Sequence, residues 1–237
     1  MKYKWQYIPC RCLIVLLILL LHAEYFVIPA EAGIQSDGRG LDSRFRGNDM
    51  LPESTDTING VIKDEDNIPI VNAEISIFDG FSIRNIKSDI NGMYIISEPP
   101  VTPDLYAVLF FTKDGYIPGI INVKRSEQVK TDYSIVMKRA QKRNTGFVAG
   151  VIYQPIRGGK IKFQSGIYNL GKGRRVWMEK DGGVIEAQSN IEGHFVFEVP
   201  VGKYILHAAG SREKAGVEVV EGKTVIRNMR SGIVLID

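Results

Sequence analysis

The chain has 237 residues, of which 44% are hydrophobic and 24% charged, and its formal net charge is +3. This length suits one or two domains, and the charge balance lacks the strongly basic character of nucleic-acid-binding proteins. The 24 glycines, set among β-branched runs, indicate many short strands and turns. The sequence therefore predicts an all-β protein without a nucleic-acid partner.

The first residues have the pattern of a secretory signal peptide. Two lysines precede an apolar run at 13–21, and small residues follow it. The run is shorter than the roughly 20 apolar residues that a membrane span needs. Cleavage after Ala23 fits the distance from the apolar run better than cleavage after Ala32. We therefore expect a signal peptide at 1–23 and an exported protein, periplasmic or at the cell surface. An uncleaved signal anchor is the alternative, and it is the only membrane contact that we expect.

Both cysteines, Cys10 and Cys12, lie in this predicted signal peptide. Neither follows a lipobox-like sequence, so no lipid anchor is expected. After cleavage the protein would have no thiol and no disulfide. Its fold would then depend on its hydrophobic core, which excludes cysteine-based metal or nucleophile chemistry.

Residues 27–49 contain two nonapeptides whose coding sequences are related. The segments 27–35 and 41–49 share no amino-acid pattern, yet the genetic code allows reverse-complementary DNA to encode both over their full length. The segment therefore resembles a translated mobile inverted repeat, shaped by a DNA hairpin and not by protein function. Together with its glycines and polar residues, this predicts a disordered linker at 24–56.

From residue 57 onward, short β-rich runs alternate with turns, and the pattern occurs twice. The segment 88–96 (SDINGMYII) matches 189–197 (SNIEGHFVF) in character at almost every position. Other matching landmarks follow the same order in both halves: Gly60-Val61-Ile62 with Gly150-Val151-Ile152, Pro69-Ile70 with Pro155-Ile156, and Pro100-Val101 then Tyr106 with Pro200-Val201 then Tyr204. Such internal repetition indicates two copies of one module.

Each copy contains a predicted β-hairpin. Asn91-Gly92 lies between polar and apolar runs, which is a strong hairpin signal because tight hairpin turns need positive φ. Gly193 supplies the same freedom in the second copy. Apolar runs at 107–111 and 205–209 suit central strands. Each copy has roughly 80 to 90 residues, which is close to the size of an immunoglobulin-like sandwich.

These landmarks, with Gly115-Tyr116 as a final Gly-Tyr element, resemble the carboxypeptidase regulatory-like domain family. The resemblance implies two tandem seven-stranded, transthyretin-like or immunoglobulin-like β-sandwiches, and it is silent on function. It covers 57–139 well. It covers 146–237 more loosely, because the second copy lacks the Gly-Tyr element and carries an insertion near 164–184.

A short basic segment at 140–145 is expected to join the two sandwiches. It contains few apolar residues and therefore offers little interface between them. We expect the two copies to unfold separately.

Residues with catalytic or metal-binding character are scarce. His194 and His207 lie in predicted strands without the three or four ligands of a zinc site, so no metal and no cofactor are expected. The acidic groups at 64–67 and 89–91 lack the spacing and closing glutamate of a calcium loop; solvated turns are expected, with calcium as the alternative. No nucleophile elbow, phosphate loop or nucleotide fingerprint occurs, so no catalytic residue is predicted.

The predicted insertion contains the candidate binding residues Tyr168, Arg174, Arg175 and Trp177. Aromatic faces stack on sugars, and arginines pair with carboxylates or phosphates. A solvated hairpin with packed aromatic residues is the alternative.

The expected function is a non-catalytic, exported β-sandwich that binds or spaces components of the bacterial envelope. Its partner would be a cell-wall glycan or an envelope protein, and a carbohydrate- or peptidoglycan-binding protein is the alternative. A transthyretin-related hydrolase is disfavoured because the chain ends in Ile-Val-Leu-Ile-Asp at 233–237 and lacks the Tyr-Arg-Gly-Ser tail of those enzymes.

Overall fold

The computed structural model describes residues 57–97, 106–124, 132–157, 168–232 and 234–235. These residues form strands and turns without a helix, which confirms the predicted all-β class. Accordingly, nothing in the described part of the chain is a helix long and apolar enough to cross a membrane. The predicted signal peptide, both cysteines and the predicted linker lie outside the described residues.

The first sandwich consists of two sheets. Its strands are β1 (Thr57–Asp64), β2 (Glu74–Phe78), β3 (Ile83–Lys87), β4 (Met93–Ser97), β5 (Tyr106–Thr112), β6 (Gly119–Lys124) and β7 (Ile135–Met137). The order is β4-β1-β7 in one sheet and β3-β2-β5-β6 in the other. Inward side chains of both sheets form the core, among them Ile62, Ile75, Tyr94, Leu109 and Phe111. The predicted seven-stranded sandwich is confirmed here.

The second sandwich repeats this plan with additions. Its strands are β8 (Thr145–Arg157), β9 (Tyr168–Leu170), β10 (Arg175–Lys180), β11 (Gly183–Gln188), β12 (His194–Pro200), β13 (Gly202–Ala208), β14 (Ala215–Val219), β15 (Thr224–Ile226), β16 (Met229–Arg230) and β17 (Val234–Leu235). The sheet β11-β10-β13-β14 has the same order of equivalent strands as β3-β2-β5-β6. In the other sheet, β8 pairs with β12 and β15, and also with β9, β16 and β17.

Backbone hydrogen bonds confirm the repeat around 88–96 and 189–197. The amide of Ile62 donates to the carbonyl of Gly92 (2.8 Å), and Ile152 donates to Gly193 in the same way (2.9 Å). The Oδ1 atoms of Asp89 and Asn190 each accept backbone N–H bonds from the residues two and four positions later. The short polar side chain therefore holds each turn closed.

Two predicted landmark pairs are wrong. Ile70 donates its N–H to Ile62, and the equivalent bond in the second sandwich comes from Gly171 to Ile152. The counterpart of Pro69-Ile70 is therefore Leu170-Gly171; Pro155-Ile156 lies inside the long strand β8. The second wrong pair is Tyr106 with Tyr204. The cross-strand pair Ile75–Phe111 is equivalent to Val176–Ala208, so Phe111 corresponds to Ala208. Four residues earlier, Tyr204 therefore corresponds to Ala107 and not to Tyr106.

The predicted insertion near 164–184 is also misplaced. Strand β10 occupies the place of β2, next to its own partner strands β11 and β13. Residues 175–180 are thus a regular strand of the second sandwich. The extra chain of the second copy lies before β10 and includes β9, which pairs with β8.

Gly92 and Gly193 have φ values of 71° and 79°, as predicted. The turns they occupy are nevertheless not hairpins, because β3 and β4 belong to different sheets, as do β11 and β12. The chain crosses from one layer of the sandwich to the other at these points. A Cβ atom on Gly92 would overlap the carbonyl oxygen of Ile62, so this crossing requires glycine for space as well as for φ.

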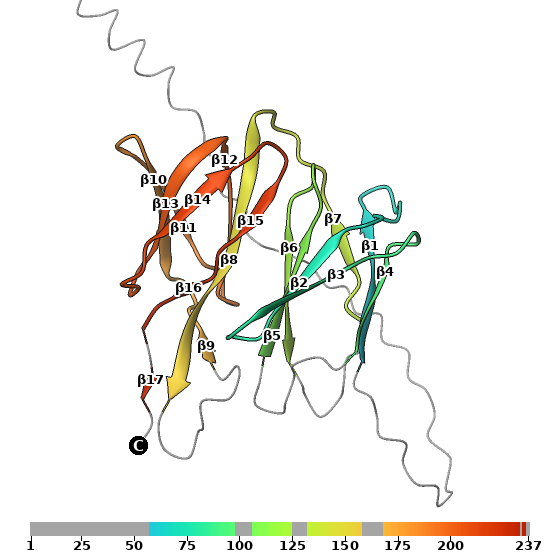
Figure 1. Cartoon of the computed structure of the whole chain (residues 1–237), viewed down its shortest axis with the longest axis horizontal. Coiled ribbons are helices and arrows are strands. Elements are labelled where there is room, and N and C mark those ends of the chain that lie inside the picture. Colours follow the sequence, from blue (N-terminus) through green and yellow to red (C-terminus); the bar gives the residue numbers. More distant parts are fainter. Residues whose placement is uncertain (1–56, 98–105, 125–131, 158–167, 233, 236–237) are drawn as a thin grey trace, which may run out of the picture.

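The two sandwiches stack face to face, giving four successive layers of sheet (Figure 1). The inner layers are β3-β2-β5-β6 and β12-β8-β15, and their facing side chains form a third core: Phe78, Val108, Phe110, Ile120, Phe147, Ala149, Val151, Tyr168 and Val196. Side chains 107–111 of β5 are consequently buried on both faces of the strand. The expectation of little interface between the copies is wrong, because the facing surfaces of two sheets bury a common core.

Candidate functional site

The structure separates the four predicted binding residues. Tyr168 is 3% exposed and lies in the inter-sandwich core, with its ring 5.8 Å from that of Phe78 and 5.9 Å from that of Tyr153. Arg174 is exposed in the turn before β10. Arg175 and Trp177 lie together on the outer face of β10. Tyr168 therefore belongs to a packed core and is not available to stack on a ligand.

Arg175 and Trp177 form a polar and aromatic cluster with side chains of the neighbouring strands. The imidazole of His207 lies parallel to the indole of Trp177, at 4.9 Å between ring centroids and 6° between planes. The guanidinium of Arg175 lies over the same indole at 4.8 Å from its centroid. The indole of Trp177 therefore already has two close neighbours, a stacked imidazole and a guanidinium.

The edge of this cluster is made of carboxylates. Arg175 donates from Nε to Oε2 of Glu186 at 2.9 Å, and this hydrogen-bonded ion pair lowers the pKa of Glu186. The indole Nε1 of Trp177 donates to Oε1 of Glu179 at 3.1 Å, and Nε2 of His207 lies 3.3 Å from Oε2 of the same carboxylate. The polar groups of the cluster thus pair mainly with one another.

The two described histidines lie in different parts of the stack. His207 belongs to the outer sheet of the second sandwich, whereas His194 begins β12 and faces the first sandwich. Nε2 of His194 is 2.7 Å from Oδ1 of Asn122 on β6. Burial lowers the pKa of His194 to about 4. The two imidazoles therefore cannot act as a pair on one substrate.

In the acidic turn at 64–67, residues 65–67 are exposed, as expected for a solvated turn, whereas Asp64 is buried. Asp64 is 1% exposed; its Oδ1 accepts N–H bonds from Asp66 and Ile68, and its Oδ2 pairs with Arg139 at 2.7 Å. These bonds, that from Arg139 above all, lower the pKa of Asp64. Among the described residues no group of three or more His, Cys, Asp or Glu could hold a metal ion.

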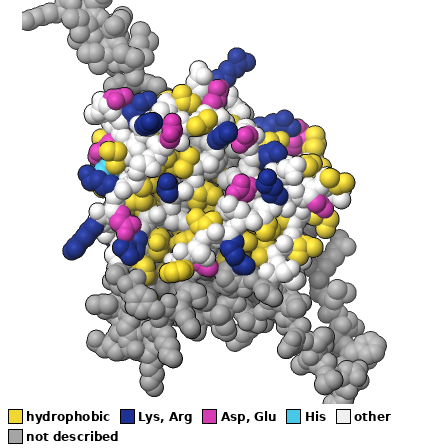
Figure 2. Space-filling model, in the orientation of Figure 1, with side chains coloured by type: hydrophobic (Ala, Val, Ile, Leu, Met, Phe, Trp, Pro, Cys, Tyr) yellow, Lys and Arg dark blue, Asp and Glu magenta, His cyan; other side chains and the backbone are white. Residues whose placement is uncertain are grey.

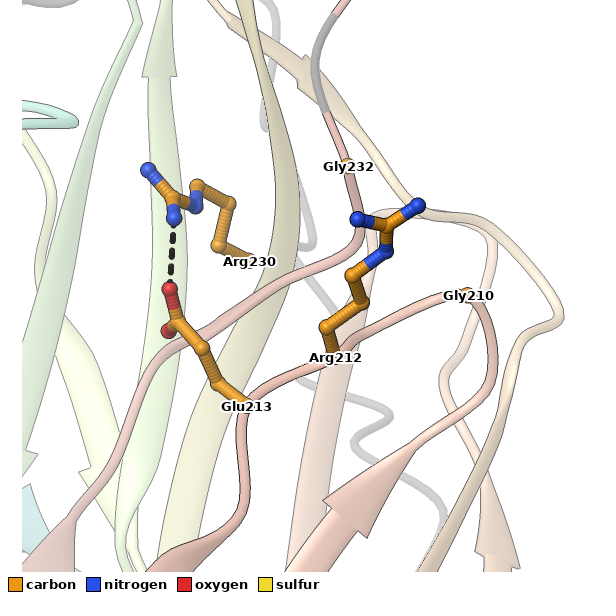
Figure 3. Close-up of a pocket in the computed structure, with 5 residues that line it drawn as sticks. All are labelled: Gly210, Arg212, Glu213, Arg230 and Gly232. Carbon is orange, nitrogen blue, oxygen red and sulfur yellow. Dashed lines mark hydrogen bonds and ion pairs between the residues drawn. The ribbon is translucent and has the colours of Figure 1, made fainter.

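A hollow of about 340 Å³ lies beside β16, in a region that sequence reasoning did not identify (Figure 3). It is lined by Gly210, Arg212, Glu213, Arg230 and Gly232. Arg230 pairs with Glu213 at 2.7 Å, while the guanidinium of Arg212 lies near Gly232. The hollow thus offers one exposed cation to an anionic group, and its described lining contains no nucleophile and no histidine.

Side chains on the visible surface do not gather into one charged or one apolar area. Lysine, arginine, aspartate and glutamate are interspersed with apolar side chains over the face seen in Figure 2. This mixed surface agrees with the small net charge of +3.

A scan against protein-family models and a search of curated proteins each gave no match. The solved structures that this chain matches include the Bacillus anthracis TIE protein, 13% identical over 75% of this chain and 34% of that one, with a TM-score of 0.30. A streptococcal ancillary pilin is 10% identical over 76% of this chain and 63% of the pilin, with a TM-score of 0.29. A single B repeat unit of the collagen-binding surface protein CNA of Staphylococcus aureus is 11% identical, over 74% and 98%, with a TM-score of 0.41. The chain therefore spans 34% and 63% of the first two proteins.

Proposed function

We propose that this chain is a non-catalytic, exported spacer of the bacterial envelope. In this proposal two carboxypeptidase regulatory-like sandwiches, at 57–139 and 146–237 with a joint at 140–145, act as one rigid block. The observation that carries the proposal is the third hydrophobic core, which fixes the orientation of one sandwich on the other.

The chemistry of this core supports a stable contact at neutral pH. Phe110 and Phe147 have no exposed surface, and Phe78 packs edge-to-face on Tyr153 at 5.1 Å between ring centroids. Burial of each such aromatic side chain stabilises the docked state by about 1.5 to 3 kcal/mol. Interfaces between loosely coupled domains are more polar than this one. A fixed separation between the two ends of the stack is what a spacer provides.

The same geometry favours a spacer over a sugar-binding protein. Sugar recognition by an aromatic residue uses an open ring face, whereas the ring of Trp177 is already stacked on His207 and lies under the guanidinium of Arg175. Tyr168, the other aromatic candidate, is buried.

Export is tested by cell fractionation and N-terminal sequencing of the protein from its native host. We expect a periplasmic or cell-surface protein that begins after Ala23. An intact Met1 in a cytoplasmic fraction would contradict export.

Rigidity and glycan binding are tested on the purified full chain. At neutral pH, small-angle scattering should fit the docked stack as one body, and a fit that needs freely moving sandwiches would rule out the spacer. Sedimentation with purified peptidoglycan should leave the protein in solution. Retention that is lost in Trp177→Ala would favour the carbohydrate-binding alternative.

A further inference from the structure

The interface between the sandwiches contains a buried, titratable side chain that bonds across it. The side chain of His194 has no exposed surface and lies at the start of β12, on the same face as Val196 of the inter-sandwich core. Its partner Asn122 belongs to β6 of the first sandwich. The bond between Nε2 and Oδ1, at 2.7 Å, therefore joins the two sandwiches at the border of their common core.

The surroundings of the ring define its protonation state in the docked stack. The amide of Asn122 donates from Nδ2 to the carbonyl of Glu192 at 3.3 Å, which turns Oδ1 toward the imidazole and makes Nε2 the donor. Nδ1 is then the unprotonated nitrogen. It is buried and has no hydrogen-bond partner among the described residues.

Within the described part of the chain, few charged groups face this nitrogen. The carboxylate of Glu192, itself 52% exposed, has its Oε2 atom 3.5 Å from Nδ1. The neighbours of His194 on β6 and β8 are Asn122 and Val151, and both are uncharged. Farther along the same face of β12, Glu198 bonds to Thr145 and lies 3.8 Å from Nζ of Lys142, so its charge is already matched.

A proton added to Nδ1 would place a positive charge in a dry interface with a single, half-exposed carboxylate as counter-ion. Opening the interface would return the same imidazole to water, where it takes up a proton near its ordinary pKa of about 6.5. The opened state therefore binds one proton more than the docked state at mildly acidic pH. By linkage, each added proton favours opening.

We infer that His194 makes the docking of the two sandwiches acid-labile, so that acid opens the stack between β6 and β12 while each sandwich stays folded. This inference rests on the proposed spacer function, to which it adds a regulated flexibility. An exported block of this kind would be rigid in neutral surroundings and would become a hinged pair in acid.

The test follows the opening of the full chain between pH 7.5 and pH 4, by small-angle scattering and by hydrogen exchange of the β6 and β12 amides. Because opening takes up one proton, its equilibrium constant should rise about tenfold for each pH unit below 6.5. With the pKa of His194 near 4 in the docked stack, the rise is about 150-fold at pH 4 and levels off at about 300-fold below it. Amides of Ile62 and Ile152, inside the two sandwich cores, should keep their protection.

Two variants distinguish His194 from general acid effects. His194→Gln keeps a donor for Asn122 but cannot take up the proton, so its docking should not change over this pH range. His207→Gln removes the histidine of the outer sheet and should open like the wild type. If His194→Gln opens with the same pH profile as the wild type, or if the wild type stays docked at pH 4, the inference is wrong.

A third measurement covers the case in which His194→Gln does not fold. The ring resonances of His194 in the wild type should titrate only together with opening; titration near pH 6.5 in a stack that remains docked would overturn the inference. Unfolding of both sandwiches in one step with acid would overturn it too. Each of these results leaves the spacer function intact, because that function is tested at neutral pH.

Discussion

The two four-stranded sheets of this protein have the same strand order, yet one is buried inside the stack and the other ends it. In β3-β2-β5-β6, the outward cross-strand pairs are Ser76–Phe110 and Phe78–Val108. The equivalent pairs of β11-β10-β13-β14 are Trp177–His207 and Glu179–Ile205. The inward faces are apolar in both sheets. A few outward positions therefore decide whether such a sheet docks on a neighbour or faces water.

The two sheets also differ in where their outward side chains find contacts. The outer sheet keeps its polar contacts within its own face, where Trp177 donates to Glu179 and His207 lies beside the same carboxylate. The inner sheet has large apolar side chains that pack against the second sandwich, and the amide of Asn122 on this sheet reaches across to His194. At the position of Asn122 the outer sheet has Gly216.

The largest effect is expected when residues of the outer sheet replace those of the inner one. Phe78→Glu with Phe110→His should destabilise the docked protein by more than about 5 kcal/mol. Loss of a buried phenylalanine alone costs about 3 to 5 kcal/mol, and an unpaired buried carboxylate adds to this. Urea unfolding followed by hydrogen exchange in each half should change from one transition to two. A single unchanged transition would show that the third core does not hold the sandwiches together.

A matched pair of truncations sharpens the comparison. Val108 is fully buried, whereas its counterpart Ile205 is 45% exposed. Val108→Ala should cost about 2 kcal/mol through the cavity it leaves, and Ile205→Ala should cost less than about 0.5 kcal/mol. Equal costs, measured by urea unfolding, would mean that the two faces do not differ in burial.

The glycines at the two layer crossings should respond to the same substitution by different amounts. Gly92→Val and Gly193→Val each place a β-branched residue at positive φ, which costs about 1 to 3 kcal/mol. Gly92→Val should be the more damaging, because its new Cβ meets the backbone of Ile62, whereas that of Gly193→Val meets the side chain of Leu170. Thermal melts rank the two, and the reverse order would contradict the crossing geometry.

Removing the amide that bridges the interface should have a moderate effect. Asn122→Gly, which copies the outer sheet, leaves the buried Nε2 of His194 without a partner at a cost of about 1 to 3 kcal/mol. Gly216→Asn adds an amide on the open face and should change stability by less than about 0.5 kcal/mol. The free energy of unfolding of both variants at pH 7 provides the check.

The smallest effect is expected outside the stack. Deletion of 33–56, the segment with repeat-derived coding, should change the free energy of unfolding by less than about 0.5 kcal/mol. A thermal melt of the shortened chain measures it, and a large loss would show that this segment contributes to the fold.

Local patterns made much of the architecture predictable. The short β-rich runs after residue 57 identified strands, and the matching segments around Gly92 and Gly193 identified the repeat, because short-range chemistry dominates there. The sequence did not indicate which distant strands share a sheet or pack against one another. The turn at Gly92 was predicted as a hairpin because positive φ serves a hairpin and a layer crossing equally well.

The third core was also missed, and for a physical reason. Phe110 and Val108 lie in an unbroken apolar run at 107–111, and such a run indicates burial without saying which element covers each face. The predicted binding site failed for a similar reason. Tyr168 and Trp177 are near each other in sequence, but they belong to β9 and β10, which are in different sheets. Aromatic and basic composition alone did not reveal that the indole already had two close neighbours.

The third core also constrains the order of events as the chain folds. Strands β1 to β7 contain all the partners of the first sandwich, so that half can close before the rest of the chain is available. Until β8 and β12 arrive, however, Phe78, Val108, Phe110 and Ile120 face water on a completed sheet, and exposed apolar surfaces of this kind promote aggregation. The completing pairs of β8 with β15 and β16 join residues about 77 positions apart, and long loops of this kind close slowly. The first sandwich is therefore an aggregation-prone folding intermediate. How much of it aggregates depends on how quickly the second sandwich folds and covers its exposed face.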